Sequence, residues 1–515
     1  MGLSLVAFAL RIYHLNFQSL WRDEVDAIRF SSPPFLTLES VHNILGVLTQ
    51  TGHNGPLYFV ALRGWRTLTG DSEFALRYFS LLGGVLMVAL TYQAARRLKL
   101  GPSVAMVAAL LVGTSPYALW YSQEAKMYTW LACLVLFVVY AYQSALSEAT
   151  AEMVPLAGRR RWPFWWALFV VTTSLSFYLH ILSPLMLPVY VAWGLMQWPG
   201  LKAHWRGWLI SMGMLTMPYL PLLWWQAPLF INDFHSGHPF YPIQRQMSLL
   251  LHLYSLGVLQ ARFSLMAIML AVFLALAGLM QGEARRRLQI GVWFITPPLL
   301  VFLISLRVPV FEDRYLIYIL PAYYLLVALG LVMIARRERR LAWGLLALIV
   351  ALNLWNGWRQ ATTTIKPDFR SAAHYLANAP PGPTACGRDR GPVIMFQMPY
   401  LQHTFAYYTR ADFKPLDGIW SNDNRPPEQV AAEMRRLTEG VADLWLVVSE
   451  EEQWDRRRLT RSWLDEQARL VDKAHFVNVD LYRYRFGPEA EPASAPAIDG
   501  RYKVFLPLVL CAGAP

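Results

Sequence analysis

Residues 19–30 read SLWRDEVDAIRF and place two adjacent carboxylates, Asp23 and Glu24, directly after the first apolar run of the chain. Charged side chains near or inside a bilayer are costly and tend to mark function. The stretch therefore raises two linked questions: whether the chain crosses a membrane, and which chemistry needs carboxylates at its boundary.

The composition is that of a polytopic membrane protein. Of the 515 residues, 55% are hydrophobic and only 16% are charged, whereas soluble domains carry about 25% charged residues. The three cysteines form no CxxC pair, so neither a zinc knuckle nor a disulfide framework is indicated.

Apolar runs of membrane length recur along the first two thirds of the chain. They predict about eleven transmembrane helices, the first of them short. The runs lie near residues 3–15, 74–95, 102–120, 127–146, 163–179, 181–198, 207–225, 263–280, 289–306, 315–335 and 341–356.

Basic residues follow every second predicted helix and set the orientation. Loops rich in Lys and Arg stay on the cytoplasmic side, so the N-terminus is predicted to be cytoplasmic and Asp23 to face outward. The net charge of +12 then reflects membrane topology, and no nucleic-acid surface is expected. The clusters are Arg96, Arg97 and Lys99; Arg159 to Arg161; Lys202 and Arg206; Arg285 to Arg287; and Arg336, Arg337, Arg339 and Arg340.

Beyond Trp358 no apolar run of about 20 residues appears, and Pro, Asp and Arg become frequent. Leu444–Val448 reads as a buried strand and FVNVDLYRY alternates with period two, which predicts strand, helix, strand. We therefore expect a membrane domain over 1–356, a small extracytoplasmic α/β domain over 357–485, and a linker and tail over 486–515.

Four outer turns carry ionisable side chains at one membrane interface. The first outer loop contains Asp23, Glu24 and the polar turn TGHNGPLYF (Thr51–Phe59), which includes His53. The others are LWYSQEAKMYTW with Tyr121, Glu124 and Lys126, FYLHIL with His180, and FEDRY with Arg314 and Tyr315.

Together these motifs resemble the GT-C superfamily of membrane glycosyltransferases, in particular the protein O-mannosyltransferase and lipid A aminoarabinose transferase type. The resemblance covers about residues 1–356, and it departs from the family at Gly55–Pro56, where two prolines are common. It implies transfer of a sugar from a polyprenyl-phosphate donor to an acceptor hydroxyl outside the membrane, with inversion. It also implies that Asp23 is the aspartate of the first outer loop.

The chemistry of such a reaction assigns roles to the outer residues. A carboxylate must take the proton of the acceptor hydroxyl, which points to Asp23, with Glu24 as the alternate or supporting acid. The leaving phosphate needs cationic donors, for which Arg314 ranks first and Lys126 second. Tyr315, Tyr121, Glu124, His53 and His180 complete the predicted substrate-binding set. The alternative for Arg314 is an internal ion pair with Asp313 or Glu124.

Several alternatives stay open at this level. A divalent metal is possible, because His53, Glu124, His180, His235 and His238 are all expected on the outer side, but they show no recognisable ligand spacing beyond His235 and His238. A transporter or lipid flippase would explain the many helices and would need polar midplane groups and an internal repeat. A sensor or scaffold would leave the carboxylates idle. The hexosyl or pentosyl group transferred, and the choice of protein, lipid or cell-wall glycan as acceptor, stay undetermined.

Overall fold

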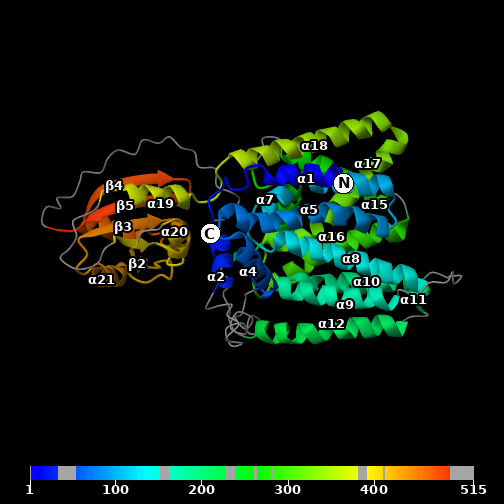
Figure 1. Cartoon of the computed structure of the whole chain (residues 1–515), viewed down its shortest axis with the longest axis horizontal. Coiled ribbons are helices and arrows are strands. Elements are labelled where there is room, and N and C mark those ends of the chain that lie inside the picture. The colour runs from blue at the N-terminus through cyan, green and yellow to red at the C-terminus, as the bar shows by residue number, and fades with distance from the viewer. Residues whose placement is uncertain are drawn as a thin grey trace. The chain divides into compact units, whose positions relative to one another are not determined.

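The computed structural model describes residues 2–32, 54–150, 162–202, 205–227, 231, 238–259, 264–280, 283–380, 391–409 and 412–487. The chain divides into two units (Figure 1). The membrane unit comprises residues 1–15 and 27–362, and the α/β unit comprises residues 16–26 and 363–515. The second unit thus includes a segment of the first outer loop as well as the C-terminal part of the chain.

The membrane unit is helical throughout its described parts, and its long helices run side by side in Figure 1. Its elements are α1 (Gly2–Ile12), α2 (Arg22–Phe30, from Ala27 onward in this unit), α4 (Leu57–Thr69), α5 (Glu73–Arg97), α6 (Pro102–Thr114), α7 (Pro116–Ser122), α8 (Tyr128–Thr150), α9 (Trp162–Leu179), η1 (Ser183–Met186), α10 (Leu187–Met196), α11 (Trp198–Leu201), α12 (Trp205–Gln226), α14 (Ile243–Leu256), α15 (Ser264–Met280), α16 (Ala284–Ser305), η3 (Asp313–Ile319), α17 (Leu320–Arg337) and α18 (Arg339–Thr362).

The predicted class, a polytopic helical membrane protein with a small α/β domain, is confirmed, and each of the eleven apolar runs coincides with helix. Within the described residues, five helices are long and apolar enough to cross a membrane, or six if the bent pair α6 and α7 is one span. Four other predicted segments are shorter apolar helices, of 10–17 residues: Gly2–Ile12, Phe164–Leu179, Ser183–Met196 and Ser264–Met280.

The bend between α6 and α7 has a local cause in the sequence Ser115–Pro116. Proline has no N–H and its ring collides with the preceding turn of a helix, so the two helices meet at an angle of 57°. The hydroxyl of Ser115 begins the second helix by accepting a hydrogen bond from the N–H of Ala118, at 3.3 Å. The break deprives carbonyl groups of α6 of their helical donors.

Arg11, fully buried on α1, supplies the missing donors. Its Nη1 donates to the carbonyl oxygen of Gly113 at 3.0 Å and its Nη2 to that of Val112 at 3.4 Å. Its Nε donates to the hydroxyl of Ser122 at 3.1 Å. A Cβ on Gly84 would overlap Ser122 and approach Arg11 to 2.8 Å, so glycine is required where α5 passes this contact. Because lipid offers no hydrogen bonds, such a break needs an internal partner.

The α/β unit is a five-stranded sheet with helices on both faces. The strand order is β2-β1-β3-β5-β4, in which β2, β1 and β3 are parallel and β5 and β4 are antiparallel additions. Its elements are α19 (Phe369–Asn378), β1 (Val393–Phe396), α20 (Leu401–Tyr408), β2 (Lys414–Asp417), α21 (Pro427–Leu437), β3 (Asp443–Val448), α22 (Glu451–Trp454), α23 (Leu459–Gln467), β4 (Arg469–Phe476) and β5 (Val479–Arg485).

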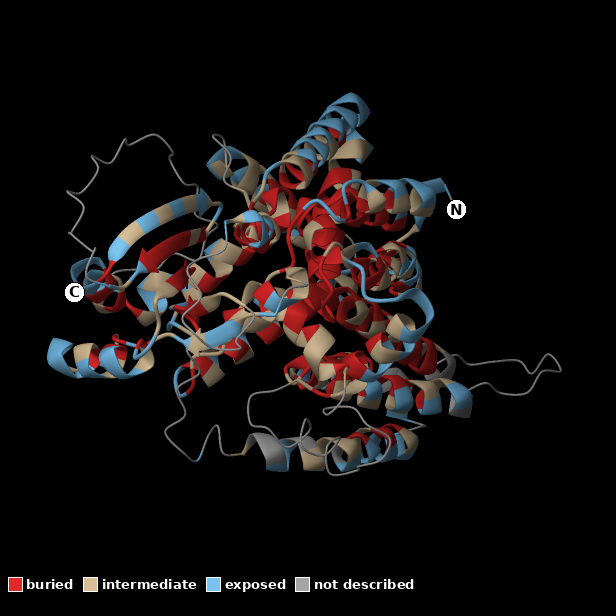
Figure 2. Ribbon diagram, turned by 60° about the vertical axis from the view of Figure 1, so that its left-hand side comes forward, coloured by how far each residue is buried: buried red, intermediate tan, exposed pale blue. Residues whose placement is uncertain are grey.

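Alternation of side chains along the strands produces two apolar cores. Ile394, Phe396 and Trp445 face α19 and α20, whereas Met395 and Leu446 face α21 and α23. At the edge, β4 alternates between exposed and half-buried residues, as Figure 2 shows. The run predicted as one final strand is wrong in detail: Asn478, with φ of 54°, makes a tight turn that divides it into the hairpin β4–β5.

Replacement of Arg11 by Met should destabilise the membrane unit, because methionine keeps much of the volume but donates no hydrogen bond. Each buried acceptor left without a donor costs about 1–3 kcal/mol. We expect a lower midpoint of thermal unfolding for the purified protein in detergent. The matched control is Arg340→Met, which removes an exposed arginine. Equal midpoints for the two variants would show that contacts other than those of Arg11 stabilise the interruption between α6 and α7.

Candidate functional site

The WRDE motif begins a helix. The N–H groups of Glu24 and Val25 both donate to the carbonyl oxygen of Trp21, which starts α2. Asp23 and Glu24 therefore lie in its first turn, where the positive end of the helix dipole favours ionised carboxylates. Asp23 is half-buried and Glu24 is fully buried.

Glu24 forms a buried ion pair with Lys366, which precedes α19. Lys366 Nζ lies 2.9 Å from Glu24 Oε2, and the two side chains are 5% and 0% exposed. A fully buried carboxylate with this partner is engaged in structure. The two adjacent acids therefore have different environments, and that of Glu24 favours a supporting role.

Backbone and side-chain hydrogen bonds hold the same segment to the C-terminal part of the α/β unit. Gln18 accepts from the N–H groups of Ile365 and Lys366 at 3.0 and 3.2 Å and donates to the carbonyl oxygen of Thr363 at 2.7 Å. Arg370 donates to the carbonyl oxygens of residues 16 and 18. Tyr408 OH accepts from the N–H of Leu20 at 2.5 Å. The start of α2 is thus part of the α/β unit.

Two side chains at the carboxyl ends of parallel strands lie near Asp23. Tyr400 follows β1, and the guanidinium carbon of Arg22 lies over its ring, 3.6 Å from the ring centroid. Tyr400 OH donates to Glu450, after β3, at 3.0 Å. Burial raises the pKa of Glu450, and the nearby charge of Asp23 raises it further, against the opposing effects of Tyr400 and Arg22. Open α/β sheets bind ligands at this edge.

The membrane unit contains a second cluster, built from turns that are far apart in sequence. Tyr121 OH donates to Asp313 Oδ2 at 2.8 Å, which joins the end of α7 to the start of η3. The rings of Tyr121 and Tyr128 are 5.5 Å apart, and those of Tyr128 and Tyr315 are 6.4 Å apart. Arg314 lies 6.0 and 5.8 Å from the centroids of the latter two rings.

Three further predicted residues belong to this cluster. His180 lies between α9 and η1, with its ring 4.9 Å from that of Tyr315. Lys126 and Glu124 are buried in the turn between α7 and α8. Lys126 lies close enough to His180 to interact with it electrostatically, and Glu124 interacts in the same way with Tyr121. The membrane unit therefore brings together Tyr121, Glu124, Lys126, His180, Arg314 and Tyr315, while Asp23 and Glu24 belong to the α/β unit.

Arg314 also lies near the carboxylate of Glu312, and its pairing with Asp313 or Glu124 stays a prediction. Arg314 Nε lies 3.9 Å from Glu312 Oε2, a distance at which the hydrogen-bond component is weak. Glu312 Oε1 instead lies 3.0 Å from Nδ1 of His238. His53 and His235 lie outside the described residues, and no group of three or more potential metal-ligating side chains occurs within the described ones.

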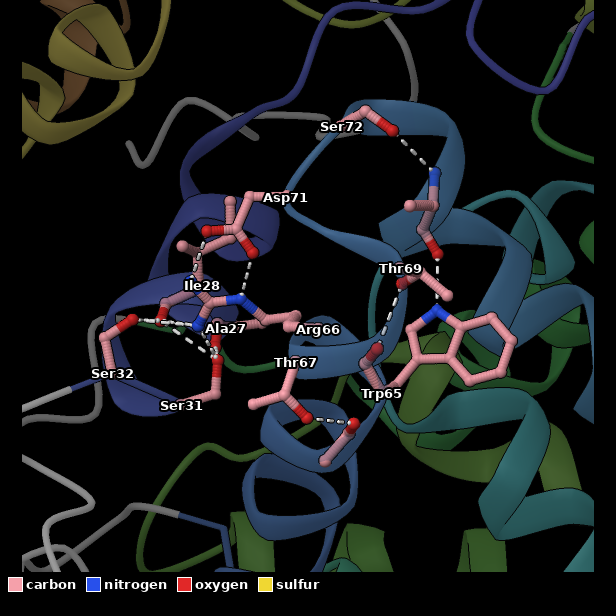
Figure 3. A network of polar contacts seen from close by, with 12 residues as sticks. Ala27, Ile28, Ser31, Ser32, Trp65, Arg66, Thr67, Thr69, Asp71 and Ser72 are labelled. Atoms are coloured by element: carbon pink, nitrogen blue, oxygen red, sulfur yellow. Dashed lines mark hydrogen bonds and ion pairs between the residues drawn. The ribbon is translucent and has the colours of Figure 1, made fainter.

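The end of α2 is tied to α4 by one arginine within the membrane unit. Arg66 forms two hydrogen bonds with the carboxylate of Asp71, at 2.6 and 2.8 Å (Figure 3). Its Nη1 also donates to the hydroxyls of Ser31 and Ser32 and to the carbonyl oxygen of Ile28. Arg66 thus stabilises the C-terminal end of α2.

An apolar cavity of about 500 Å³ lies beside α4, α5, α8 and α9. Leu57 and Leu179 line it and are neighbours in sequence of Gly55 and His180. The remaining lining is also largely aliphatic or aromatic and includes Tyr58, Phe79, Trp130 and Phe137. A cavity of this kind suits a hydrocarbon chain.

Five residues at these sites escaped the sequence analysis as site residues. Lys366, Tyr400 and Glu450 lie in the C-terminal region, where no motif pointed to the first outer loop. The sequence suggests Asp313 only as a partner of Arg314, and Tyr128 falls within the predicted apolar helix 127–146. The signal that was available is the isolated lysine in TTIKPDF (Thr363–Phe369), placed between a membrane helix and a predicted helix.

No protein-family model matches the sequence, and no curated protein matches it significantly. Solved structures are similar in fold. ArnT from Cupriavidus metallidurans, in the apo state and bound to undecaprenyl phosphate, gives TM-scores of 0.58 and 0.59 at 13% identity, covering 93% of this chain and 97% of that one. AglB, an oligosaccharyltransferase from Archaeoglobus fulgidus, in complex with an inhibitory peptide and a dolichol-phosphate, gives 0.55 at 11% identity, covering 90% and 70%.

Both neighbours are GT-C glycosyltransferases, and the match extends over almost the whole chain, including the α/β unit. Identities of 11–13% leave the architecture as the shared property. The chain has the fold of the GT-C membrane glycosyltransferases.

Proposed function

We propose that the protein is an inverting glycosyltransferase that moves a sugar from a polyprenyl-phosphate donor to an acceptor hydroxyl on the outer face of the membrane. The observation that carries the proposal is the cluster of Arg314, Lys126 and His180 among buried tyrosines, at turns of a GT-C fold. Undecaprenyl phosphate bound to ArnT and dolichol-phosphate bound to AglB support the class of donor.

The donor phosphate is assigned to Arg314 and Lys126. Arginine forms bidentate, charge-assisted hydrogen bonds to phosphate, and Arg314 is partly exposed, with 18% of its side chain accessible. Lys126 adds a second positive charge. The apolar cavity lined by Leu57 and Leu179 is proposed to hold part of the isoprenoid chain.

Asp23 is proposed to take the proton of the acceptor hydroxyl. Polyprenyl phosphate is a good leaving group, so the reaction needs a base more than an acid. Asp23 is half-buried at a helix N-terminus, whereas Glu24 is engaged by Lys366. A single base with in-line attack inverts the anomeric carbon.

The cytoplasmic loops are assigned by charge. The clusters at Arg285–Arg287 and Arg336–Arg340 lie at ends of α16, α17 and α18, and the positive-inside rule places them in the cytoplasm. The candidate residues then face outward, as does the α/β unit. A flippase would also contain a broken helix, but the break between α6 and α7 is filled by Arg11.

Membranes or nanodiscs containing the protein should transfer labelled sugar from an undecaprenyl-phosphate donor, and Asp23→Asn should abolish most of this turnover. Asparagine keeps the size of aspartate but accepts no proton, and general base catalysis contributes about 10²–10⁴-fold. The measurement is the transfer rate at saturating donor, with undecaprenyl phosphate binding as the control that should be unaffected. A parent-like rate for Asp23→Asn would remove Asp23 from the chemistry. Lipid movement across the bilayer without transfer would favour a flippase.

Glu24→Gln alone should destabilise the α/β unit, because it leaves Lys366 charged and buried without its carboxylate. Breaking a buried pair costs about 3–5 kcal/mol, whereas replacing both partners can be nearly neutral. The double variant Glu24→Gln, Lys366→Met should therefore recover much of the lost thermal stability. Glu283→Gln, which breaks the exposed pair with Arg286, is the control, expected to cost about 0–1 kcal/mol. Additive losses in the double variant would exclude this coupling.

Arg314→Ala should weaken use of the donor by roughly 1.5–3 kcal/mol, the usual range for hydrogen bonds to charged groups. Arg314→Lys should restore only part of the loss, since lysine acts as a point charge. The measurements are KM for the lipid-linked sugar and affinity for undecaprenyl phosphate. Unchanged values in both variants would give Arg314 a structural role.

A further inference from the structure

His180 is held in a tight turn between two membrane helices. Its N–H donates to the carbonyl oxygen of Ser176 at 3.1 Å, and its own carbonyl oxygen accepts from the N–H of Ser183 at 3.0 Å. The imidazole folds back over the turn, where Nδ1 accepts a hydrogen bond from the N–H of Leu182 at 3.2 Å. Only 1% of the residue is exposed.

The contact with Leu182 determines the tautomer. A backbone N–H can only donate, so Nδ1 must present its lone pair, and the proton of a neutral imidazole is then on Nε2. Burial, together with the charges of Arg314 and Lys126, lowers the pKa of His180 to about 3. The ring is therefore neutral at physiological pH, with one N–H available at Nε2.

That N–H is buried, and it has no hydrogen-bond partner among the residues that the structure describes. A buried donor without an acceptor is unfavourable unless a ligand supplies one. The ring lies 4.9 Å from Tyr315 and 6.5 Å from Tyr128. The same two rings lie within about 6 Å of the guanidinium of Arg314. The unsatisfied donor therefore lies beside two cations, Arg314 and Lys126, which can attract an anion. The same cluster also contains the carboxyl groups of Glu124 and Asp313.

We propose that Nε2–H of His180 donates a hydrogen bond to a phosphate oxygen of the polyprenyl phosphate, as a neutral third donor beside Arg314 and Lys126. The inference rests on the proposed function and specifies its phosphate site. Arg314 and Tyr315 are partly exposed and His180 is not, so the phosphate approaches from the side of those two residues.

A neutral donor suits the charge change of the transfer. The bond between the anomeric carbon and the phosphate oxygen breaks, and its electron pair stays on that oxygen. A bond to the acceptor oxygen forms, and the hydroxyl proton passes to Asp23. The phosphate thereby changes from a monoanion to a dianion, and Arg314 and Lys126 are the cations proposed to attract it. A preformed donor in a buried site stabilises the negative charge that develops on the phosphate. Because the imidazole is neutral, it does so without adding a third positive charge.

The first outer loop fixes the turn that carries this donor. Asn54 Oδ1 accepts a hydrogen bond from the N–H of Ile181 at 3.4 Å. Gly55 packs so closely on Tyr178 that an added Cβ would overlap its carbonyl oxygen. Glycine is therefore required at position 55, and Asn54 and Gly55 have a physical role in positioning His180.

The test compares the parent with His180→Phe and His180→Gln. Phenylalanine keeps a planar ring without an N–H, whereas glutamine carries an amide N–H at a similar reach. We expect His180→Phe to lower kcat by about 10²–10³-fold, the usual effect of removing one such donor. Affinity for undecaprenyl phosphate should fall by about tenfold, since a charge-assisted bond is lost. His180→Gln should recover at least a tenfold part of the loss in kcat.

The readouts are kcat, KM, undecaprenyl phosphate affinity in nanodiscs and thermal midpoint. Parent-like kcat and affinity in His180→Phe would overturn the inference, as would equal losses in both variants at parent-like midpoints. If the parent's rate changes between pH 5.5 and 7.5 and this change disappears in His180→Phe, the imidazole titrates in that range. This result would overturn the inference that His180 acts as a neutral donor. If the parent neither binds undecaprenyl phosphate nor transfers sugar, the proposed function itself fails, which these outcomes distinguish.

Discussion

An interrupted helix inside a membrane must find hydrogen-bond partners within the protein, and Arg11 provides them here. Because Pro116 ends α6, the carbonyl groups of Val112 and Gly113 face the guanidinium of Arg11. The break turns α7 by 57° and so directs the tyrosines of that helix, and the turn that follows it, toward η3 and His180. The charge placed in the first membrane helix is therefore a structural requirement for the polar cluster.

A second buried charge organises the α/β unit. Lys366 neutralises Glu24, and the hydrogen bonds of Gln18 and Arg370 fix the neighbouring backbone. Of the two adjacent carboxylates in WRDE, Glu24 is fully buried in an ion pair with Lys366, and Asp23 is half-buried in the first turn of α2. Similar residues in sequence thus have different environments, because the helix turns them by about 100° relative to each other.

The sequence predicted the membrane helices well because their signal is local. Apolar length and alternating basic loops suffice to position eleven segments, and the structure places helix at each. The resemblance to GT-C transferases rested on short motifs in the right order, and the fold comparison agrees with it. The outer residues of the membrane unit were found because charge is conspicuous among apolar neighbours.

Other features depend on distant partners and could not be read from local pattern. Lys366 looked like an ordinary linker lysine, and its role exists only because Glu24 lies 342 residues earlier in the chain. The hairpin turn at Asn478 lacked the Asn-Gly pair that usually marks such turns. The tautomer of His180 depends on a hydrogen bond to Leu182, which composition and periodicity do not reveal.

The shared unit of residues 16–26 and 363–515 also has a consequence for biosynthesis. The segment with Asp23 is made before most of the membrane helices, whereas Lys366, Arg370 and Tyr408 follow only after those helices are made. At typical elongation speeds of about 5–20 residues per second, the 342 residues between Glu24 and Lys366 take roughly 20–70 s to synthesise. During that interval the ion pair between Glu24 and Lys366 cannot form. A chain that stops short of residue 366 therefore contains every predicted membrane helix but not the lysine that pairs with Glu24.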